Sequence, residues 1–482
     1  MSSNLTNGGT TQFGVLSDGQ IEQVLLAAME LLEGTGTRIY CKEARDVLKA
    51  GGAVVKGETA YIPSGLVREM LACTPPRIAL GNRDGQRTMI LEGRRIYFGT
   101  GSDCPFILDS KTGERRKFLK KDVEDAARVV DACPNMDFHM SLGLTSDVPG
   151  PTYDRHQAAA MLRHTVKPLV LTAMSREGLA DILEMYYLLR GGRDAFEINP
   201  GFIIYLEPTT PLLHSQAAVE KLLFSAERRI PAIYTPCPIT GATAPATMAS
   251  GLVLALAEFL AGMVIAQLKR RGAPLIMGGV CSLMDMSSTI LSYGAPELSL
   301  LSAALTDIAH HLKIPMFSTA GCSDSKALDE QAAVEATFSV LASALSGANL
   351  IHDVGYLESA MVGSFDMVVL SDEVIGMAKR LVRGIEVSDE TLAVDVIRAA
   401  GPGGNFLAED HTYRHFKQEF WFPRLLDRTR FDAWAASGKP TLKARVKARV
   451  HDILATHQVA PLPSDVSKGI DKILAKADKN QR

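Results

Sequence analysis

The stretch Thr235-Pro-Cys-Pro-Ile-Thr-Gly-Ala-Thr-Ala-Pro-Ala-Thr247 joins a short apolar run, residues 230–234, to a long apolar helical pattern, residues 248–270. Its prolines, Pro236 and Pro238, cannot donate to a sheet ladder, so they predict that a β-strand ends here. A helix whose N-terminus faces the carboxyl end of the preceding strand is a frequent way for α/β proteins to build a binding site. The stretch therefore predicts an α/β fold with a site near this turn.

The same turn contains residues suited to starting a helix. Gly241 allows backbone conformations that other residues resist. We expect Thr243 to be the N-cap of the next helix and Pro245 to lie in its first turn, where a missing N–H costs little. The helix N-terminus after Gly241 is then available to an anionic group.

Outward from this turn, short apolar runs recur along the chain, and each is followed by a helical pattern. Eight such runs occupy residues 95–99, 137–142, 168–172, 202–206, 232–235, 274–278, 315–319 and 349–353. The helical patterns between and after them occupy residues 120–132, 155–165, 176–189, 215–229, 246–270, 295–312, 329–345 and 366–385. Eight alternating β and α units in about 290 residues predict a (β/α)8 TIM barrel.

A doubly wound open sheet is the alternative fold. Such a fold commonly carries a Gly-x-Gly-x-x-Gly turn between its first strand and a helix. The stretch Phe98-Gly-Thr-Gly-Ser-Asp103 lacks the third glycine, and no helical pattern follows it directly. The barrel is therefore favoured.

The segments on either side of the barrel have helical patterns. We predict a helical N-terminal module (residues 1–90), a catalytic barrel (residues 91–387) and a helical C-terminal extension (residues 388–482). Trp421 and Trp434 are expected to anchor the extension to the barrel.

Composition limits the kind of protein. The chain has 482 residues, 46% hydrophobic and 22% charged, with a formal net charge of −3. These values are ordinary for a globular enzyme and carry no nucleic-acid signature. The seven cysteines include no Cys-x-x-Cys pair, and residues 1–9 show no secretion signal. A protein of the reducing cytoplasm is expected.

One segment has the composition of a membrane span. Residues 249–268 are almost wholly apolar, although Glu258 interrupts them, and no second segment of this kind is present. A barrel helix that is buried on most sides has the same pattern. We therefore expect a buried helix and no membrane association.

Polar and aromatic residues gather at the predicted carboxyl ends of the strands, where barrels place their active sites. Asp103, Glu207 and His352 lie where a buried strand meets a loop. Aromatic side chains occur near the same ends, among them Tyr97, Tyr205 and Tyr356. Aromatic faces with a nearby carboxylate are a known means of holding a quaternary ammonium group. These six residues are the predicted substrate-binding residues.

Three cysteines follow three successive strands. If the thiolates of Cys237, Cys281 and Cys322 converged on the barrel mouth, they would form a zinc site that activates a thiol. Small thiols also pack well beside glycine in tight turns, without any metal. Both interpretations stay open from the sequence.

Several motifs, in a fixed order, resemble the trimethylamine methyltransferase family. They are Phe98-Gly-Thr-Gly-Ser-Asp103, Pro236-Cys-Pro-Ile-Thr-Gly-Ala-Thr-Ala-Pro-Ala-Thr247, Leu252-Val-Leu-Ala-Leu-Ala-Glu-Phe-Leu-Ala-Gly262 and Gly321-Cys-Ser-Asp-Ser-Lys-Ala-Leu-Asp-Glu-Gln-Ala332. The resemblance runs from about residue 15 to about residue 430. It implies a (β/α)8 barrel that moves a methyl group from an amine to the cobalt of a separate small corrinoid protein.

The archaeal founders of that family carry pyrrolysine, which this sequence lacks. The resemblance is therefore to the non-pyrrolysine branch, and it implies a quaternary amine as substrate, with glycine betaine preferred and dimethylglycine as product. The chain has no Asp-x-His-x-x-Gly sequence, so the corrinoid is expected on the partner protein. No bound metal is expected.

A quaternary nitrogen needs no general acid, because the amine leaves as a neutral molecule. The site must hold the cation, exclude water and direct one methyl group at Co(I). If the substrate carries a carboxylate, the helix N-terminus beside Gly241 and Thr243, or His352, is expected to receive it. The remaining alternatives are the zinc-dependent methyltransferase and a non-catalytic betaine-binding protein. The apolar helices also favour a homo-oligomer.

Overall fold

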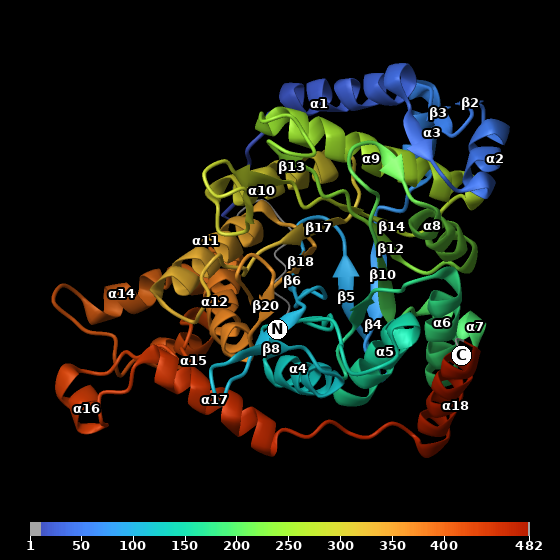
Figure 1. The fold of residues 1–482 in the computed structure, drawn as a ribbon. Coiled ribbons are helices and arrows are strands. Elements are labelled where there is room, and N and C mark those ends of the chain that lie inside the picture. The colour runs from blue at the N-terminus through green and yellow to red at the C-terminus, as the bar shows by residue number, and fades with distance from the viewer. Residues whose placement is uncertain (1–10, 481–482) are drawn as a thin grey trace.

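The computed structural model describes residues 11–480, and at its centre is a seven-stranded parallel sheet. Residues 1–9, which we examined for a secretion signal, lie outside the described residues. In spatial order the strands are β6 (Tyr97–Phe98), β18 (Leu350–His352), β17 (Met316–Thr319), β14 (Leu275–Gly278), β12 (Ala232–Tyr234), β10 (Phe202–Leu206) and β9 (Leu169–Leu171). They correspond to seven of the eight predicted runs, and the sheet is curled rather than flat (Figure 1). This order, in which sequential strands are neighbours, does not fit the doubly wound alternative.

The remaining predicted strand, residues 137–142, does not form a regular strand. Isolated parallel bridges pair Phe138 with Gly99 and His139 with Leu169. The Asp137 N–H also donates to the Phe98 carbonyl at 2.7 Å. The prediction of a full strand is therefore wrong, because only one residue bridges each neighbour. The segment nevertheless contacts the chain at both edges of the sheet.

Eight helices alternate with the strands and surround the sheet (Figure 1). They are α4 (Lys120–Ala132), α5 (Tyr153–His164), α6 (Arg176–Arg190), α8 (Gln216–Arg228), α9 (Met248–Lys269), α10 (Pro296–His311), α11 (Glu330–Ser346) and α12 (Phe365–Arg383). Two short helical segments, η2 (Gly150–Thr152) and α7 (Arg193–Ile198), lie in the connections. The apolar periodicity of these helices made their positions predictable, because each buries one face against the strands.

Helix α9 is the apolar segment that resembles a membrane span. By length and composition it is the one helix among residues 11–480 that could cross a membrane, yet 78% of its most apolar window is buried inside the protein. Glu258, within it, accepts hydrogen bonds from the Leu212 N–H at 2.7 Å and the Thr210 hydroxyl at 2.8 Å. These bonds satisfy a carboxyl group that would otherwise be costly to bury. The predicted buried core helix is confirmed.

The start of α9 differs from its prediction. Thr247, not Thr243, is the N-cap residue, and its side chain makes no capping hydrogen bond. Pro245 precedes the helix. The Thr243 hydroxyl instead accepts from the Ile239 N–H at 2.9 Å. This bond closes the turn that follows β13 (Ile239–Thr240). Local turn hydrogen bonds competed with helix formation here.

A hairpin packs against the amino-terminal end of the curled sheet. It consists of β4 (Ile78–Gly81) and β5 (Arg87–Leu91). The N–H groups of Gly81 and Arg83 donate to Pro200 and Val166, which precede β10 and β9. Apolar residues of the hairpin pack against one inward side chain from each central strand. The central-strand residues are Val170, Ile203, Ile233, Ile276, Phe317, Leu350 and Tyr97. The hairpin therefore covers the amino-terminal end of the sheet and leaves the carboxyl end to the loops that follow the strands.

The N-terminal segment is mixed rather than wholly helical. It contains α1 (Asp18–Glu30), η1 (Leu31–Thr35), α2 (Lys42–Ala50) and α3 (Ser64–Cys73), which pack against α9. It also contains β1 (Thr37–Ile39), β2 (Val54–Lys56) and β3 (Thr59–Tyr61), which form a sheet with β11 (Leu213–His214). Strands this short leave little period-two pattern, and the partner β11 is distant in sequence, so they were missed.

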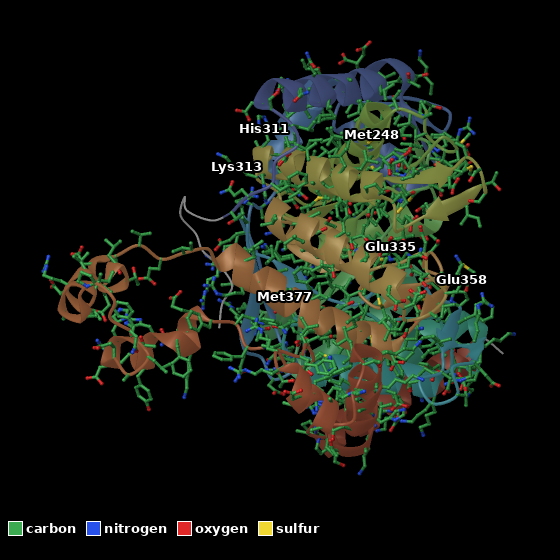
Figure 2. The ribbon with its side chains drawn as sticks, turned by 90° about the vertical axis from the view of Figure 1, so that its left-hand side faces the viewer. Met248, His311, Lys313, Glu335, Glu358 and Met377 are labelled. Atoms are coloured by element: carbon green, nitrogen blue, oxygen red, sulfur yellow. The ribbon has the colours of Figure 1, made fainter. Side chains whose placement is uncertain are left out.

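The C-terminal segment is helical, as expected. It contains α13 (Asp389–Leu392), α14 (Val394–Ala400), α15 (Asp410–Glu419), α16 (Phe431–Ala436), α17 (Leu442–Thr456) and α18 (Ser464–Asn480). Helices α17 and α18 pack on the body, whereas α13–α16 project from it as an arm (Figures 1 and 2). Trp421 lies beside Gly376 of α12, so it contacts the body, whereas the Trp434 indole donates to the Pro440 carbonyl in the connection between the arm and α17. The anchoring prediction is therefore supported for Trp421 and stays a prediction for Trp434.

Candidate functional site

Two small sheets surround the carboxyl end of the central sheet. One contains β13, β15 (Ser282–Asp285) and β16 (Ile290–Ser292). The other contains β7 (Phe106–Leu108), β8 (Arg115–Lys117), β19 (Tyr356–Leu357) and β20 (Val362–Gly363). Each is built from loops that leave the central strands. They give the carboxyl edge rigid walls, which irregular loops would not provide.

A buried His–Asp pair lies at the end of β18. The His352 Nδ1 faces the Ser318 carbonyl at 2.8 Å, so this nitrogen carries the proton and Nε2 is left as an acceptor. Asp353 Oδ1 lies 3.1 Å from that Nε2, and Asp353 Oδ2 accepts from the Thr319 hydroxyl at 2.8 Å. Burial lowers the pKa of His352 to about 4 and raises the pKa of Asp353 to about 7. The imidazole is therefore neutral at physiological pH, and a protonated Asp353 can donate to it.

Asp103 is held beside this pair by its backbone. Its N–H donates to the Tyr356 hydroxyl at 2.8 Å, and Oδ1 accepts from the Ser102 hydroxyl at 2.5 Å. Gly101 makes this approach feasible, because a Cβ there would overlap with both the Tyr356 hydroxyl and Asp353 Oδ1. Burial, and then the charge of Asp353, raises the pKa of the Asp103 carboxyl. The Gly-Thr-Gly-Ser-Asp motif thus positions one carboxyl group against another.

Three rings pack together next to the carboxyl groups and form an aromatic wall, in which Tyr205 is half-buried and Phe317 and His352 are buried behind it. The Phe317 and His352 ring centroids are 3.9 Å apart, and Tyr205 lies 5.8 Å from Phe317 and 6.4 Å from His352. The Tyr205 hydroxyl donates to Glu207 Oε2 at 3.2 Å. Strands β10, β17 and β18, of which only β17 and β18 are neighbours, supply residues that lie on the same face of the curled sheet. The wall is neutral, and its edge carries Glu207.

The site is a recess rather than a sealed core. The Asp103 and Glu207 side chains are accessible to solvent, yet enough protein surrounds them that desolvation raises the pKa of both carboxyls. Tyr205, Cys237 and Tyr293 are half-buried, and desolvation also raises the pKa values of their side chains. This partly enclosed surface at the carboxyl end of the sheet is called the recess. Its chemistry is acidic and aromatic, which suits a cation.

The structure brings five of the six predicted aromatic and polar residues to one place. Asp103, Glu207, His352, Tyr205 and Tyr356 all contribute, although Tyr356 is fully buried and holds Asp103 rather than facing the recess. Tyr97 does not belong to the site. Its hydroxyl accepts from the Ile90 N–H at 3.0 Å in the hairpin at the opposite end of the sheet. Tyr97 begins its strand, so its inward side chain joins the lower core layer.

Gly241, Thr243 and His352, the predicted receptors for a substrate carboxylate, do not provide a cationic or helix N-terminal group in the recess. Gly241 has the anticipated positive φ of 88°, but a Cβ there would meet Met284 and Met286 of the β15 sheet and loop. Thr243 closes a local turn, and the first residue of α9, Met248, is exposed (Figure 2). His352 is neutral and has a partner at each nitrogen. None of these supplies a positive charge to the recess.

The three cysteines do not form a common site. Cys281 donates to the Gly251 carbonyl at 3.7 Å, and Cys322 donates to the Asp353 carbonyl at 3.3 Å. Desolvation raises the pKa of all three thiols, which disfavours the thiolates that zinc requires. In the part of the chain that the structure describes, they do not form a cluster with metal-ligand spacing. This arrangement does not support the zinc alternative.

Three residues beside the recess were not among the predicted substrate-binding residues. Asp353 follows His352 directly and has a φ of 71°, uncommon for a residue other than glycine, but the sequence does not reveal a backbone angle. Phe317 looks like any core strand residue. Tyr293 lies in a loop after β16, and the charge of Asp353 contributes to raising its pKa. A tertiary contact, not a local signal, places each of them at the site.

The loop with the Gly321-Cys-Ser-Asp-Ser-Lys326 motif supports the recess. Asp324 accepts from the Tyr293 N–H at 2.9 Å and from the Ser359 hydroxyl at 2.7 Å. Glu335 accepts from the Ser323 hydroxyl at 2.6 Å and the Asp324 N–H at 2.8 Å. The motif therefore ties the loops after β16, β17 and β18 together, which fixes the rim.

Comparison with known proteins identifies the class. A model of the trimethylamine methyltransferase family matches residues 2–481. The chain is 31% identical to a trimethylamine methyltransferase of Desulfitobacterium hafniense (96% of this chain, 93% of the relative). It is 30% identical to a glycine betaine methyltransferase of the same species (97% and 98%) and 33% identical to a trimethylamine methyltransferase of Methanosarcina barkeri (99% and 97%). The chain belongs to the trimethylamine methyltransferase family, and it is a methyltransferase.

A solved structure shows the same fold. The monomethylamine methyltransferase of Methanosarcina barkeri superposes with a TM-score of 0.53 over 98% of this chain and 90% of that chain, at 12% sequence identity. At this identity the likeness concerns the fold alone.

Proposed function

We propose that the protein transfers a methyl group from a quaternary amine to the Co(I) corrinoid of a separate corrinoid protein. The observation that supports this most is the recess at the carboxyl edge of the sheet. There, the accessible carboxyl groups of Asp103 and Glu207 lie beside the half-buried Tyr205 ring, which is backed by the buried Phe317 and His352. A methylated ammonium group combines an apolar surface with a positive charge, and this lining matches both properties.

The recess residues act by binding and orientation. Co(I) supplies the nucleophile, and the C–N bond breaks with its electron pair on nitrogen, so the amine leaves neutral and needs no acid. The rings hold the methyl groups and exclude water, while the rigid rim limits rotation of the substrate. Orientation of one methyl group toward the open side of the recess is the main task of this chain.

The raised pKa values suit this chemistry. Positive charge on nitrogen falls in the transition state, so a strongly anionic site would stabilise the bound substrate more than the transition state. Burial raises the pKa of Asp103 and Glu207, and it raises that of Asp353 to about 7. Asp353 is therefore only partly ionised at neutral pH, which limits the negative charge beside the recess.

Glycine betaine is the proposed substrate, and dimethylglycine is the product. The absence of pyrrolysine and the match to a glycine betaine methyltransferase over nearly the whole chain support this choice. One observation favours a second candidate. The described recess residues are acidic or neutral, so a cation without a carboxylate, such as choline, avoids the repulsion that glycine betaine meets. Glycine betaine must direct its carboxylate away from Asp103 and Glu207.

We further propose that the sheet closes into a (β/α)8 barrel through residues 137–142, which bridge both of its edges. On that basis the chain divides into an N-terminal segment (residues 1–90), the barrel (residues 91–387) and a C-terminal extension (residues 388–482). The protein acts in the cytoplasm, where its corrinoid partner must also be present. A homo-oligomer also remains part of this proposal, and the exposed apolar side chains of the arm are candidates for its interface.

A panel of amines tests the function. The purified protein is incubated with chemically reduced cobalamin and, in turn, glycine betaine, proline betaine, carnitine, choline and trimethylamine. Formation of methylcobalamin is followed by absorbance. Methylation from at least one quaternary amine, but not from trimethylamine, is expected. Amine binding without methylcobalamin, even with corrinoid partner proteins added, would identify a binding protein instead.

A further inference from the structure

The arm, defined as residues 388–437, has no apolar core of its own. Its helices α13, α14, α15 and α16 contain no buried residue, and the arm projects from the body of the protein (Figure 2). Helices of this length obtain most of their stability from packing, which these lack. The base of the arm is held by the body, where the Arg424, Leu425 and Leu426 N–H groups donate to Glu373, so a further interaction is needed only where α13 meets α15.

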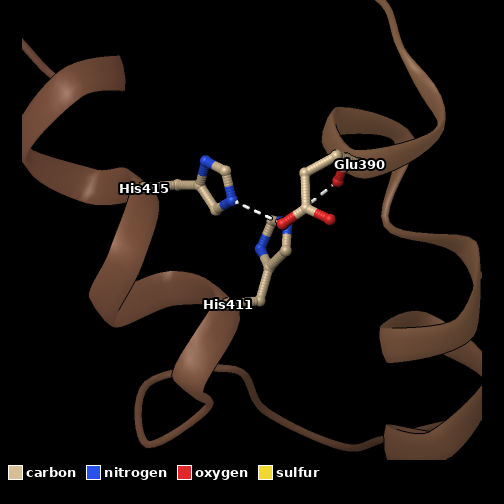
Figure 3. Close-up of side chains that lie close together, drawn as sticks. All are labelled: Glu390, His411 and His415. Carbon is tan, nitrogen blue, oxygen red and sulfur yellow. Dashed lines mark hydrogen bonds and ion pairs between the residues drawn. The ribbon is translucent and has the colours of Figure 1, made fainter.

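The contacts between α13 and α15 converge on one residue. His415 Nε2 lies 3.0 Å from Glu390 Oε1, and His411 Nε2 lies 3.0 Å from the Glu390 carbonyl. The two histidines are four residues apart on α15, so they occupy the same face of the helix, and their ring centroids are 4.3 Å apart. Figure 3 shows both rings beside the Glu390 side chain.

We propose that Glu390, His411 and His415 bind a divalent transition metal ion, with Zn²⁺ as the principal candidate, and that the ion fastens α13 to α15. One ligand atom from each residue lies within 4.8 Å of the others. Within residues 11–480 this is the one group of three or more histidine, cysteine or carboxylate side chains that meets this spacing. A pair of imidazoles four residues apart on a helix, completed by a carboxylate, is a donor set that zinc favours.

The geometry needs only small adjustments. Zinc binds nitrogen and oxygen at about 2.1 Å, so its ligand atoms lie about 3.4 Å apart in a tetrahedral site. Rotation of these side chains, one exposed and two half-buried, brings the ligand atoms together. A tautomer change moves each imidazole proton from Nε2 to Nδ1 and frees the Nε2 lone pair. The fourth position is left to water.

The charges at the site are compatible with a cation. The exposed Glu390 carboxyl, whose Oε1 faces His415 Nε2, supplies the negative charge. Arg414 lies 3.3 Å from the same carboxyl oxygen and competes with a metal ion. Its side chain is largely exposed and can rotate into solvent, where it is well hydrated.

Zinc titration of the full-length protein tests this proposal. After treatment with a chelator, the protein is titrated with Zn²⁺ alone in a calorimeter, and proteolysis of residues 388–437 is compared with and without the metal. One equivalent is expected to bind and to slow cleavage of the arm. His411→Ala and His415→Ala are each expected to weaken zinc binding about tenfold or more. His451→Ala, which changes an exposed histidine on α17, is the matched control and should bind like the wild type.

His415→Gln gives a second comparison, because glutamine can still donate to Glu390 but ligates zinc poorly. It should preserve the unliganded arm, as judged by its proteolysis pattern, and lose the protection that zinc gives. Equal zinc affinity in the wild type and in His411→Ala/His415→Ala would overturn the proposal, since the ion would then bind elsewhere, for example at cysteines. If the arm is cleaved at the same rate with and without zinc, the proposal is also overturned.

Discussion

Asp353 Oδ1 lies 3.1 Å from His352 Nε2, and the other nitrogen of this imidazole faces the Ser318 carbonyl. The pair is therefore a neutral histidine next to a carboxyl group that titrates near neutrality. An ionisable group of this kind, beside a recess for a cation, should make binding depend on pH.

Asp353→Asn should remove part of this pH dependence. Because the folded-state pKa of Asp353 is about 7, it becomes negative as the pH rises from 6 to 8, and it should then attract a cation more strongly. The Kd of the wild type for tetramethylammonium, which does not titrate, should fall about three- to tenfold over this range. The asparagine variant should show a flatter profile in calorimetry. The same steep profile in both proteins would exclude Asp353 as its origin.

The same substitution should change stability in a defined direction. A raised folded-state pKa means that the neutral carboxyl favours the fold. This contribution is complete below the ordinary carboxyl pKa of about 4, and it is lost as the pH rises through about 7. Thermal melts at pH 6 and pH 8 should therefore show a smaller decrease for Asp353→Asn than for the wild type.

Asp103→Asn should weaken substrate binding. Asp103 is an accessible carboxyl in the recess, and its loss should raise KM for a quaternary amine about tenfold, or about 1.4 kcal/mol. The effect on kcat should be smaller, because attraction to the substrate cation falls in the transition state. Asp465→Asn, at an exposed position in α18, should leave both constants unchanged. A fall in kcat alone would argue for a role in chemistry rather than in binding.

Tyr205→Phe and Tyr205→Ala should have different effects. Phenylalanine keeps the aromatic face 5.8 Å from Phe317 but loses the hydroxyl that donates to Glu207. If the ring holds the methyl groups, Tyr205→Phe should bind within about threefold of the wild type, and Tyr205→Ala should bind about tenfold more weakly. Equal losses would show that the hydroxyl, not the ring, is important. Steady-state KM values distinguish the two.

Gly101→Ala should abolish activity without unfolding the protein. A Cβ at this position overlaps with Tyr356 and Asp353, so both side chains must move and Asp103 loses its backbone partner. The expected loss of stability is about 1–3 kcal/mol, as for other overpacked sites. Gly65→Ala in α3, where no atom lies within 4 Å of the added Cβ, is the control and should retain activity. Full activity of Gly101→Ala would contradict the placement of Asp103.

The sequence alone determined the βα alternation. Apolar runs bounded by glycine and proline located seven parallel strands, and apolar periodicity located the eight helices around them, because each element must bury one face. It also placed Asp103, Glu207, His352 and Tyr205 near one another, because parallel strands bring their carboxyl ends to one edge. Three of the four quoted motifs of the trimethylamine methyltransferase family lie at those ends, and the fourth, residues 252–262, lies within the buried helix α9.

Tertiary structure decided what depends on contacts between distant segments. In the folded protein the Tyr97 hydroxyl bonds to the hairpin at the amino-terminal end of the sheet, and the Thr243 hydroxyl bonds within a turn. Thr247 is therefore the N-cap residue of α9. Tertiary structure also separated the three cysteines and paired His352 with Asp353. Backbone angles set the directions of these side chains, and burial sets their pKa values. Local residue patterns encode neither. Tertiary structure also brought Glu390 to His411 and His415 across a connection between two helices.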